Sequence, residues 1–148
     1  MLHHRKCFFV LVCGLVLTAS LAFAADREVV KLGTQGAGPY SPGIIADADK
    51  LVFTSGQLGL DASGKLPEGI EAQTKQALDN VKAVLEAAGS GMDKVVKVTI
   101  YMTDIKDYGT VNGIYKTYFS KDFPARTALQ VANLPLGGLI EIEAIAVK

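Results

Sequence analysis

The spacing of apolar residues along the chain predicts two amphipathic helices. Between residues 69 and 88, apolar side chains recur three or four positions apart, at Ile70, Ala77, Leu78, Val81, Val84, Leu85 and Ala88. This spacing is typical of a helix with one buried face, and the following Gly89 is a favourable stop. The same spacing predicts a second helix over 107–121. It overrides Asn112-Gly113, a pair that favours a hairpin turn when strands flank it.

Alternating and β-branched stretches predict strands on both sides of these helices. The clearest is residues 94–104, "KVVKVTIYMTD". Further strands are expected at 29–32, twice within 43–60 with a turn at 47–50, at 125–131 and at 139–147. A Gly- and Pro-rich loop over 33–43 and a turn-rich connection over 61–69 separate the early elements.

The predicted order of elements is β, β, β, α, β, α, β, β. It favours an α+β fold, in which a mixed β-sheet carries two helices on one face. The last strand has apolar residues on both of its faces, since Ile140 and Ile142 lie on one face and Ile145 and Val147 on the other. The uncovered face of the sheet is therefore expected to be buried by another subunit, so we predict an oligomer.

The first 24 residues have the pattern of a secretory signal peptide. Arg5 and Lys6 precede the apolar run 8–17, and Ala22-Phe23-Ala24 forms a small-x-small cleavage site. We expect cleavage after Ala24, export to the periplasm or the exterior, and a single mature domain over 25–148. An uncleaved membrane anchor is the alternative, although the apolar segment is marginal for a span. Intact-mass analysis of the exported protein would refute cleavage by finding residues 1–24 retained.

Removal of this leader changes the chemistry that remains. Both cysteines and both histidines of the chain lie within residues 1–24. The predicted mature domain therefore excludes disulfides, catalytic Cys or His groups, and thiolate or imidazole metal ligands. Its 13 basic and 15 acidic residues give a net charge of about −2, which disfavours nucleic-acid binding. Arg, Lys, Tyr, carboxylates, amides and hydroxyls remain for chemistry, with no metal or cofactor expected.

Arg126 is the best single candidate for a binding residue. It lies among small and apolar residues in the predicted strand 125–131, and arginine is well suited to hold a carboxylate through two hydrogen bonds. A surface ion pair is the structural alternative. Tyr40, Ser55 and Glu141 are weaker candidates, because structural roles explain them equally well. These roles are, respectively, packing in a loop, capping of a turn and a contact at an interface. The stretch "GTQGAG" matches neither the GxGxxG spacing nor the GxxxxGK(S/T) spacing of nucleotide-binding loops.

Seven stretches of the chain together resemble the RidA family, which is also called YjgF/YER057c/UK114. They occur in order over nearly the whole of the predicted mature domain: "GPYSPG", "FTSGQ", "QALDNVKAVLEAAG", "VVKVTIYMTD", "VNGIY", "FPART" and "IEIEAIAV". The match is best to the members of the family that carry an arginine in the "FPART" position. The leader lies outside the resemblance.

The resemblance implies a chorismate-mutase-like fold assembled as a homotrimer, with active sites in clefts between subunits. It implies hydrolysis of reactive 2-imino acids and their enamine tautomers, such as 2-aminoacrylate, to 2-keto acids and ammonia. The family's carboxylate-binding arginine falls on Arg126 and its water-orienting glutamate on Glu141. The other site positions fall on Tyr40, Ser55 and Asn112.

One position departs from the family pattern, and alternatives to the enzyme remain. Ala128 stands where relatives often have a cysteine, although the hydrolysis does not require that thiol. A non-catalytic carboxylate-binding or holdase module on the same fold is the alternative function. A ribonuclease activity, which has also been attached to the family, fits poorly with an acidic domain that lacks histidine. We expect a small carboxylate as the partner, and neither nucleic acid nor membrane after cleavage.

Overall fold

The computed structural model describes residues 27–29, 44–46, 50–119 and 121–148. Its strands are β1 (Arg27–Val29), β2 (Ile44–Ala46), β3 (Leu51–Phe53), β4 (Gln57–Leu58), β5 (Val95–Met102), β6 (Ala125–Gln130) and β7 (Ile140–Val147). Its helices are α1 (Ile70–Ala87) and α2 (Tyr108–Tyr118), with short 3-10 turns η1 (Met92–Lys94), η2 (Ile105–Asp107) and η3 (Pro135–Gly137).

The main sheet is mixed and has the strand order β3-β7-β5-β6, with β4 also paired to β7. β5 and β6 are parallel, because α2 carries the chain back across the sheet between them. β7 is antiparallel to β3, β4 and β5. β1 and β2 form a separate antiparallel pair. The predicted mixture of parallel and antiparallel neighbours is thus confirmed.

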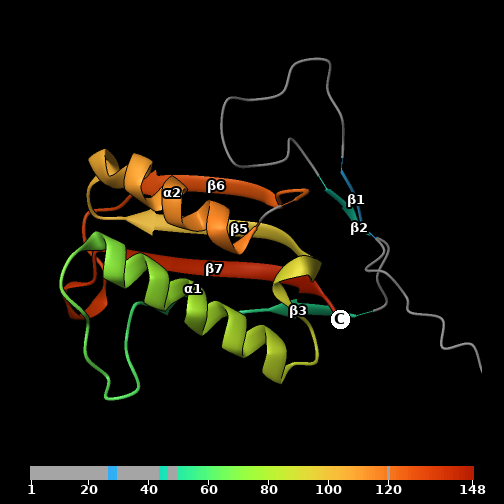
Figure 1. Ribbon diagram of the computed structural model, residues 1–148, viewed down its shortest axis with the longest axis horizontal. Coiled ribbons are helices and arrows are strands. Elements are labelled where there is room, and N and C mark those ends of the chain that lie inside the picture. The colour runs from blue at the N-terminus through green and yellow to red at the C-terminus, as the bar shows by residue number, and fades with distance from the viewer. Residues whose placement is uncertain (1–26, 30–43, 47–49, 120) are drawn as a thin grey trace, which may run out of the picture.

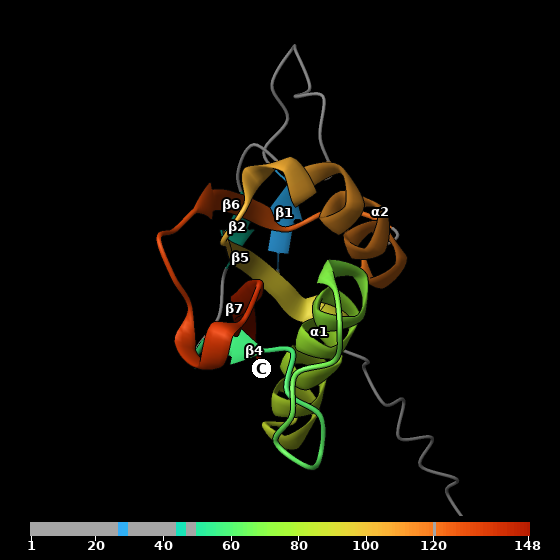
Figure 2. The same cartoon turned by 90° about the vertical axis from the view of Figure 1, so that its left-hand side faces the viewer.

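Both helices cover the same face of the main sheet (Figure 1), and the edge-on view in Figure 2 places them on one side of the strands. The core lies between these two layers. Its large, fully buried apolar side chains come from α1, β5, α2 and β7: Leu78, Val81, Leu85, Val95, Val98, Ile100, Met102, Val111, Tyr115, Ile140 and Ile142. Burial of each large apolar side chain contributes about 1.5–3 kcal/mol, so this layer supplies most of the driving force for folding.

α1 ends where the sequence predicts, and the structure shows how. Gly89 has φ of 75°, a left-handed conformation that glycine adopts without steric cost. The Gly89 N–H donates to the Glu86 carbonyl at 3.0 Å, and the Ser90 N–H donates to the Leu85 carbonyl at 2.9 Å. This pair of hydrogen bonds satisfies carbonyls that the last helical turn would leave unpaired.

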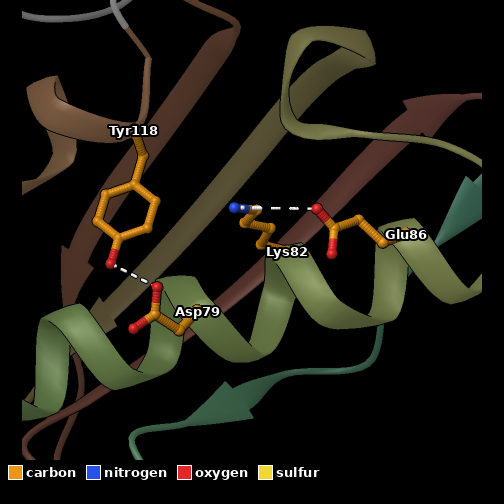
Figure 3. A network of polar contacts seen from close by, with 4 residues as sticks. All are labelled: Asp79, Lys82, Glu86 and Tyr118. Carbon is orange, nitrogen blue, oxygen red and sulfur yellow. Dashed lines mark hydrogen bonds and ion pairs between the residues drawn. The ribbon is translucent and has the colours of Figure 1, made fainter.

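A tyrosine near the end of α2 ties the two helices together. The Tyr118 hydroxyl donates to Asp79 Oδ1 of α1 at 2.7 Å (Figure 3). It also lies 3.2 Å from the Lys75 carbonyl of α1, a second acceptor. Desolvation of the phenol, together with this hydrogen bond to the Asp79 carboxylate, raises the pKa of Tyr118. The phenol therefore remains a hydrogen-bond donor over the whole physiological pH range.

The other face of the sheet has no helix over it and carries large apolar side chains. Phe53 is 67% exposed and Leu51 is 47% exposed. Lys97 Nζ on this face donates to Thr127 Oγ1 at 2.7 Å, while burial lowers the pKa of Lys97 and nearby Glu143 opposes that shift. This open face combines apolar and polar groups in the manner of a protein interface.

The structure confirms the predicted fold class and both helices, and it corrects one detail of the early strands. The stretch 43–60 contains three strands rather than two, and they have different partners: β2 pairs with β1, whereas β3 and β4 both pair with β7. Pattern alone cannot show this, because it fixes which residues are extended and not which strands meet. Across the described part of the chain, neither helix combines the length and apolar character that a membrane span needs.

Candidate active site

Arg126 lies on the helix-covered face of the sheet. In the parallel register of β5 and β6 it is opposite Val98, and Val98 is in turn opposite Ala144 of β7. Val98 and Ala144 are both buried against the helices, and residues in register across a sheet share a face. The arginine side chain therefore projects from the sheet toward α2.

Two tyrosines of α2 surround the Arg126 guanidinium. Its central carbon lies 4.7 Å from the centre of the Tyr115 ring and 5.5 Å from that of Tyr108. Arg126 Nη2 also donates to the Tyr108 hydroxyl at 3.0 Å. Arg126 is half-buried and is not part of the apolar core. The alternation of the strand places it inward, where the flat cation packs against aromatic faces.

Within the described part of the chain, no carboxylate neutralises Arg126, since the one ion pair there joins Lys82 to Glu86. Arg126 Nη1 is buried without a hydrogen-bond partner in that part of the structure, and so is Asn112 Oδ1. Asn112 lies one helical turn from Tyr108 on α2, and so shares the face that meets Arg126. A buried N–H group of a cation is costly to leave without a partner, so this arrangement suits a bound anion. We call Tyr108, Asn112 and Arg126 the helix-side half-site.

Glu141 lies on the opposite, open face of the sheet. It is paired with Tyr101 in the β5–β7 register, three positions along β7 from the inward-facing Ala144. Its carboxylate lies against the backbone of Gly56, where a Cβ on the glycine would overlap Glu141 Oε1 and lie 2.6 Å from its carboxyl carbon. We call Gly56 and Glu141 the open-face half-site.

Ser55 is adjacent to the open-face half-site in the chain. It is exposed between β3 and β4, and its carbonyl accepts a hydrogen bond from Gln57 Nε2 at 3.1 Å. The preceding Thr54 fixes this segment to the sheet, because its hydroxyl accepts from the Ala144 N–H at 2.9 Å. Ser55 therefore follows the end of β3, next to a residue that is hydrogen-bonded to β7.

The predicted site residues thus fall into two groups that one chain does not bring together. Arg126 and Asn112 occupy the helix-covered face, whereas Glu141 lies on the open face with Gly56, beside Ser55. The sheet lies between the two groups, so a single small substrate cannot contact Arg126 and Glu141 of the same chain at once. Tyr40 lies outside the described residues.

Sequence analysis missed two residues of these half-sites, Tyr108 and Gly56. The signal for Tyr108 was available: positions 108, 112 and 115 are spaced to share one face of the predicted helix, and that face carries three polar groups. Gly56 carried no comparable signal, because its role depends on the approach of a strand that is distant in sequence. Among the described residues, no three His, Cys, Asp or Glu side chains gather as metal ligands would.

We expect Gly56→Ala to displace the Glu141 carboxylate and to reduce turnover at least about tenfold. The reason is space rather than backbone strain, since a Cβ at Gly56 would overlap the glutamate. Steady-state kinetics on a 2-imino acid, the substrate class that the resemblance implies, measures the loss, and we expect it in kcat. Gly113→Ala is the matched control, because a Cβ there meets no atom within 4 Å. Equal kcat in Gly56→Ala and Gly113→Ala would contradict the position assigned to Glu141.

A comparison with known protein families matches residues 33–148 to the family described as Endoribonuclease L-PSP. Among curated relatives, the 2-iminobutanoate/2-iminopropanoate deaminase of Bos taurus is 52% identical over 113 residues, which cover 75% of this chain and 81% of that protein. The Escherichia coli protein of the same name is 44% identical over 115 residues, covering 75% and 88%.

Solved structures agree with this assignment. An Entamoeba histolytica protein titled a putative endoribonuclease L-PSP has a TM-score of 0.66 at 46% identity, covering 82% of this chain and 99% of its own. RidA from an Antarctic Psychrobacter has a TM-score of 0.66 at 40% identity, covering 77% and 92%. Escherichia coli TdcF, titled as a complex with bound serine, has a TM-score of 0.65 at 36% identity, covering 82% and 98%.

Proposed function

The chain belongs to the Endoribonuclease L-PSP family, also called RidA, and on that premise we propose that it hydrolyses 2-imino acids to 2-keto acids and ammonia. The observation that carries the proposal is Arg126, whose Nη1 is buried without a hydrogen-bond partner and has no carboxylate at ion-pair distance among the described residues. The names of the relatives at 52% and 44% identity agree with this activity, and serine bound to TdcF is also a small amino-acid carboxylate.

Arg126 binds the carboxylate group of the substrate. Guanidinium carries five N–H groups in a flat fork, and the hydrogen bond to Tyr108 occupies only one of them. The remaining N–H groups of Nη1 and Nη2 match the two oxygens of a carboxylate. This contact fixes the imine carbon, which is directly bonded to the carboxylate carbon, in one orientation for attack.

Glu141 supplies the base. It takes a proton from water as the oxygen attacks the imine carbon, and the C=N double bond becomes a C–N single bond in a carbinolamine. Return of protons to nitrogen and collapse of this intermediate break the C–N bond, which leaves the keto acid and ammonia. The reaction needs no redox partner, and the uncatalysed hydrolysis already occurs in water, so a base and an oriented substrate suffice.

The two half-sites meet between subunits. Since the sheet of one chain separates Arg126 from Glu141, we assign the Glu141 of each working site to a neighbouring copy, within a homotrimer. The exposed Leu51 and Phe53 support an interface on the open face. Light scattering should give a trimer, and a stable monomer at micromolar concentration would remove the basis for a shared site.

We also propose that the protein is exported, and the leader is the feature that supports this. The basic, apolar and small-x-small segments of residues 1–24 support a periplasmic or secreted enzyme. In that location its substrates would be imines released by oxidation of amino acids outside the cytoplasm. Fractionation of cells that express the full chain tests this, and recovery of the protein in the cytosol with its leader intact would overturn it.

The proposed activity is tested with imines made in place from single amino acids by an amino-acid oxidase. We expect the rate of imine loss to increase in proportion to protein concentration, with equal formation of keto acid and ammonia. A series of amino acids would define the preferred side chain. A protein that binds small carboxylates but leaves imine loss at its spontaneous rate would be the non-catalytic binding module, and the hydrolase proposal would then be wrong.

A further inference from the structure

The hydroxyl group of Tyr108 contacts Arg126 in a way that the proposed chemistry does not yet use. Tyr108 is the first residue of α2. The centre of its ring lies 5.5 Å from the central carbon of the guanidinium, and its hydroxyl lies 3.0 Å from Nη2. Tyr115 provides the second aromatic surface at 4.7 Å. Among the described residues, Arg126 is therefore in contact with two rings, while one polar contact, to the Tyr108 hydroxyl, fixes the direction of its fork.

The polar contact decides which N–H groups remain for a ligand. Stacking on a ring tolerates rotation of the guanidinium within its own plane, because the ring face offers no directional acceptor. A hydrogen bond to one terminal nitrogen removes this freedom. With Nη2 fixed by Tyr108, the unpartnered Nη1 has a defined direction.

The helical spacing places a second unpartnered polar atom beside this fork. Tyr108, Asn112 and Tyr115 share one face of α2, and Arg126 contacts the first and the last of them. Asn112 lies between these two contacts, and its Oδ1 is buried without a partner in the described structure. The face of α2 that contacts the guanidinium thus also carries a buried polar atom without a partner in the described structure.

We propose that Tyr108 is a positioning residue, whose hydroxyl orients Arg126 so that its free N–H groups face the carboxylate of the substrate. This inference rests on the proposed function for the identity of the substrate, and it adds a residue that acts through Arg126. Its contribution belongs to substrate binding rather than to proton transfer, since the base lies on the open-face half-site.

Tyr108→Phe tests the proposal because it keeps the ring and removes only the hydroxyl. We expect KM for a 2-imino acid to rise about 5- to 20-fold, while kcat changes less than about threefold. The dissociation constant of 2-oxobutanoate, an unreactive keto acid measured by titration calorimetry, should rise by a similar factor. A purely structural tyrosine would instead change the melting temperature without this selective loss of carboxylate affinity.

Tyr118→Phe is the matched control on the same helix. It removes a hydroxyl that contacts Asp79 of α1 (Figure 3) and the Lys75 carbonyl, rather than Arg126. We expect it to lower the melting temperature and to leave both KM and the affinity for 2-oxobutanoate unchanged. The two variants therefore separate loss of a tyrosine hydroxyl in general from loss of the contact to Arg126.

The outcomes distinguish this inference from the proposed function. Wild-type values of KM and of 2-oxobutanoate affinity in a folded Tyr108→Phe variant would overturn the positioning role, although imine hydrolysis could stand. A wild-type protein that binds 2-oxobutanoate but hydrolyses no imine would overturn the hydrolase, and the calorimetric comparison would still decide the role of Tyr108. A wild-type protein that binds no small carboxylate would overturn both.

Discussion

Arg126→Lys is expected to lower kcat/KM by about ten- to a hundredfold for each of the two carboxylate hydrogen bonds that it removes. Lysine preserves the charge but offers a single ammonium in place of a planar fork, and it cannot lie between two aromatic rings in the same way. Because Arg126 contacts Tyr108 and Tyr115, we also expect some loss of thermal stability. Activity measured beside thermal melting separates the two effects.

Gln130→Leu provides the control for Arg126. Gln130 is on the same strand, at an even spacing that places it on the same face, and its Oε1 accepts from the Ile105 N–H at 3.1 Å. Loss of this hydrogen bond should lower stability by about 0.5–1.5 kcal/mol and leave kcat/KM unchanged. Full activity in a folded Arg126→Lys variant would contradict the proposal that Arg126 binds the substrate carboxylate through two hydrogen bonds.

Glu141→Gln is expected to reduce kcat by about 10²- to 10⁴-fold while the affinity for 2-oxobutanoate remains close to that of the wild type. Glutamine has nearly the same shape as glutamate and fits against Gly56, but it cannot take the proton of the attacking water. Single-turnover kinetics with an imine, combined with calorimetry on the keto acid, measures the two quantities separately.

Glu143→Gln is the control for Glu141. Glu143 lies two residues along the same face of β7 and accepts a hydrogen bond from the Tyr101 hydroxyl at 3.1 Å, which glutamine can also accept. We expect kcat to change less than about threefold. Equal losses in the two variants would indicate that the charge of the open face, rather than Glu141 itself, supports the reaction.

The sequence was sufficient to predict the layers of this fold. Helical spacing identified both helices, and the positive φ of Gly89 explains why the glycine after α1 was a reliable stop. Alternation in residues 140–147 divided the side chains of β7 between two faces, and the structure shows that Ile140 and Ile142 on one of them are fully buried. These features depend on local periodicity, which a single chain records directly.

The arrangement of the site could be predicted only in part. Both Arg126 and Glu141 were recognised by their resemblance to family positions, yet their placement on opposite faces depends on the register of three strands. The contact between Glu141 and Gly56 likewise joins residues distant in sequence. The spacing of apolar residues along the chain does not predict such long-range pairings, so the structure was needed to show that the site has two halves.

The shared site is tested most directly by mixing two inactive variants. Arg126→Lys and Glu141→Gln chains, co-expressed in equal amounts, should form mixed trimers in which about one site in four combines an intact Arg126 with an intact Glu141 from the neighbouring copy. We therefore predict recovery of about a quarter of wild-type activity from two variants that are each nearly inactive. Activity no greater than that of the separate variants, in trimers shown to be mixed, would contradict a site built from two subunits.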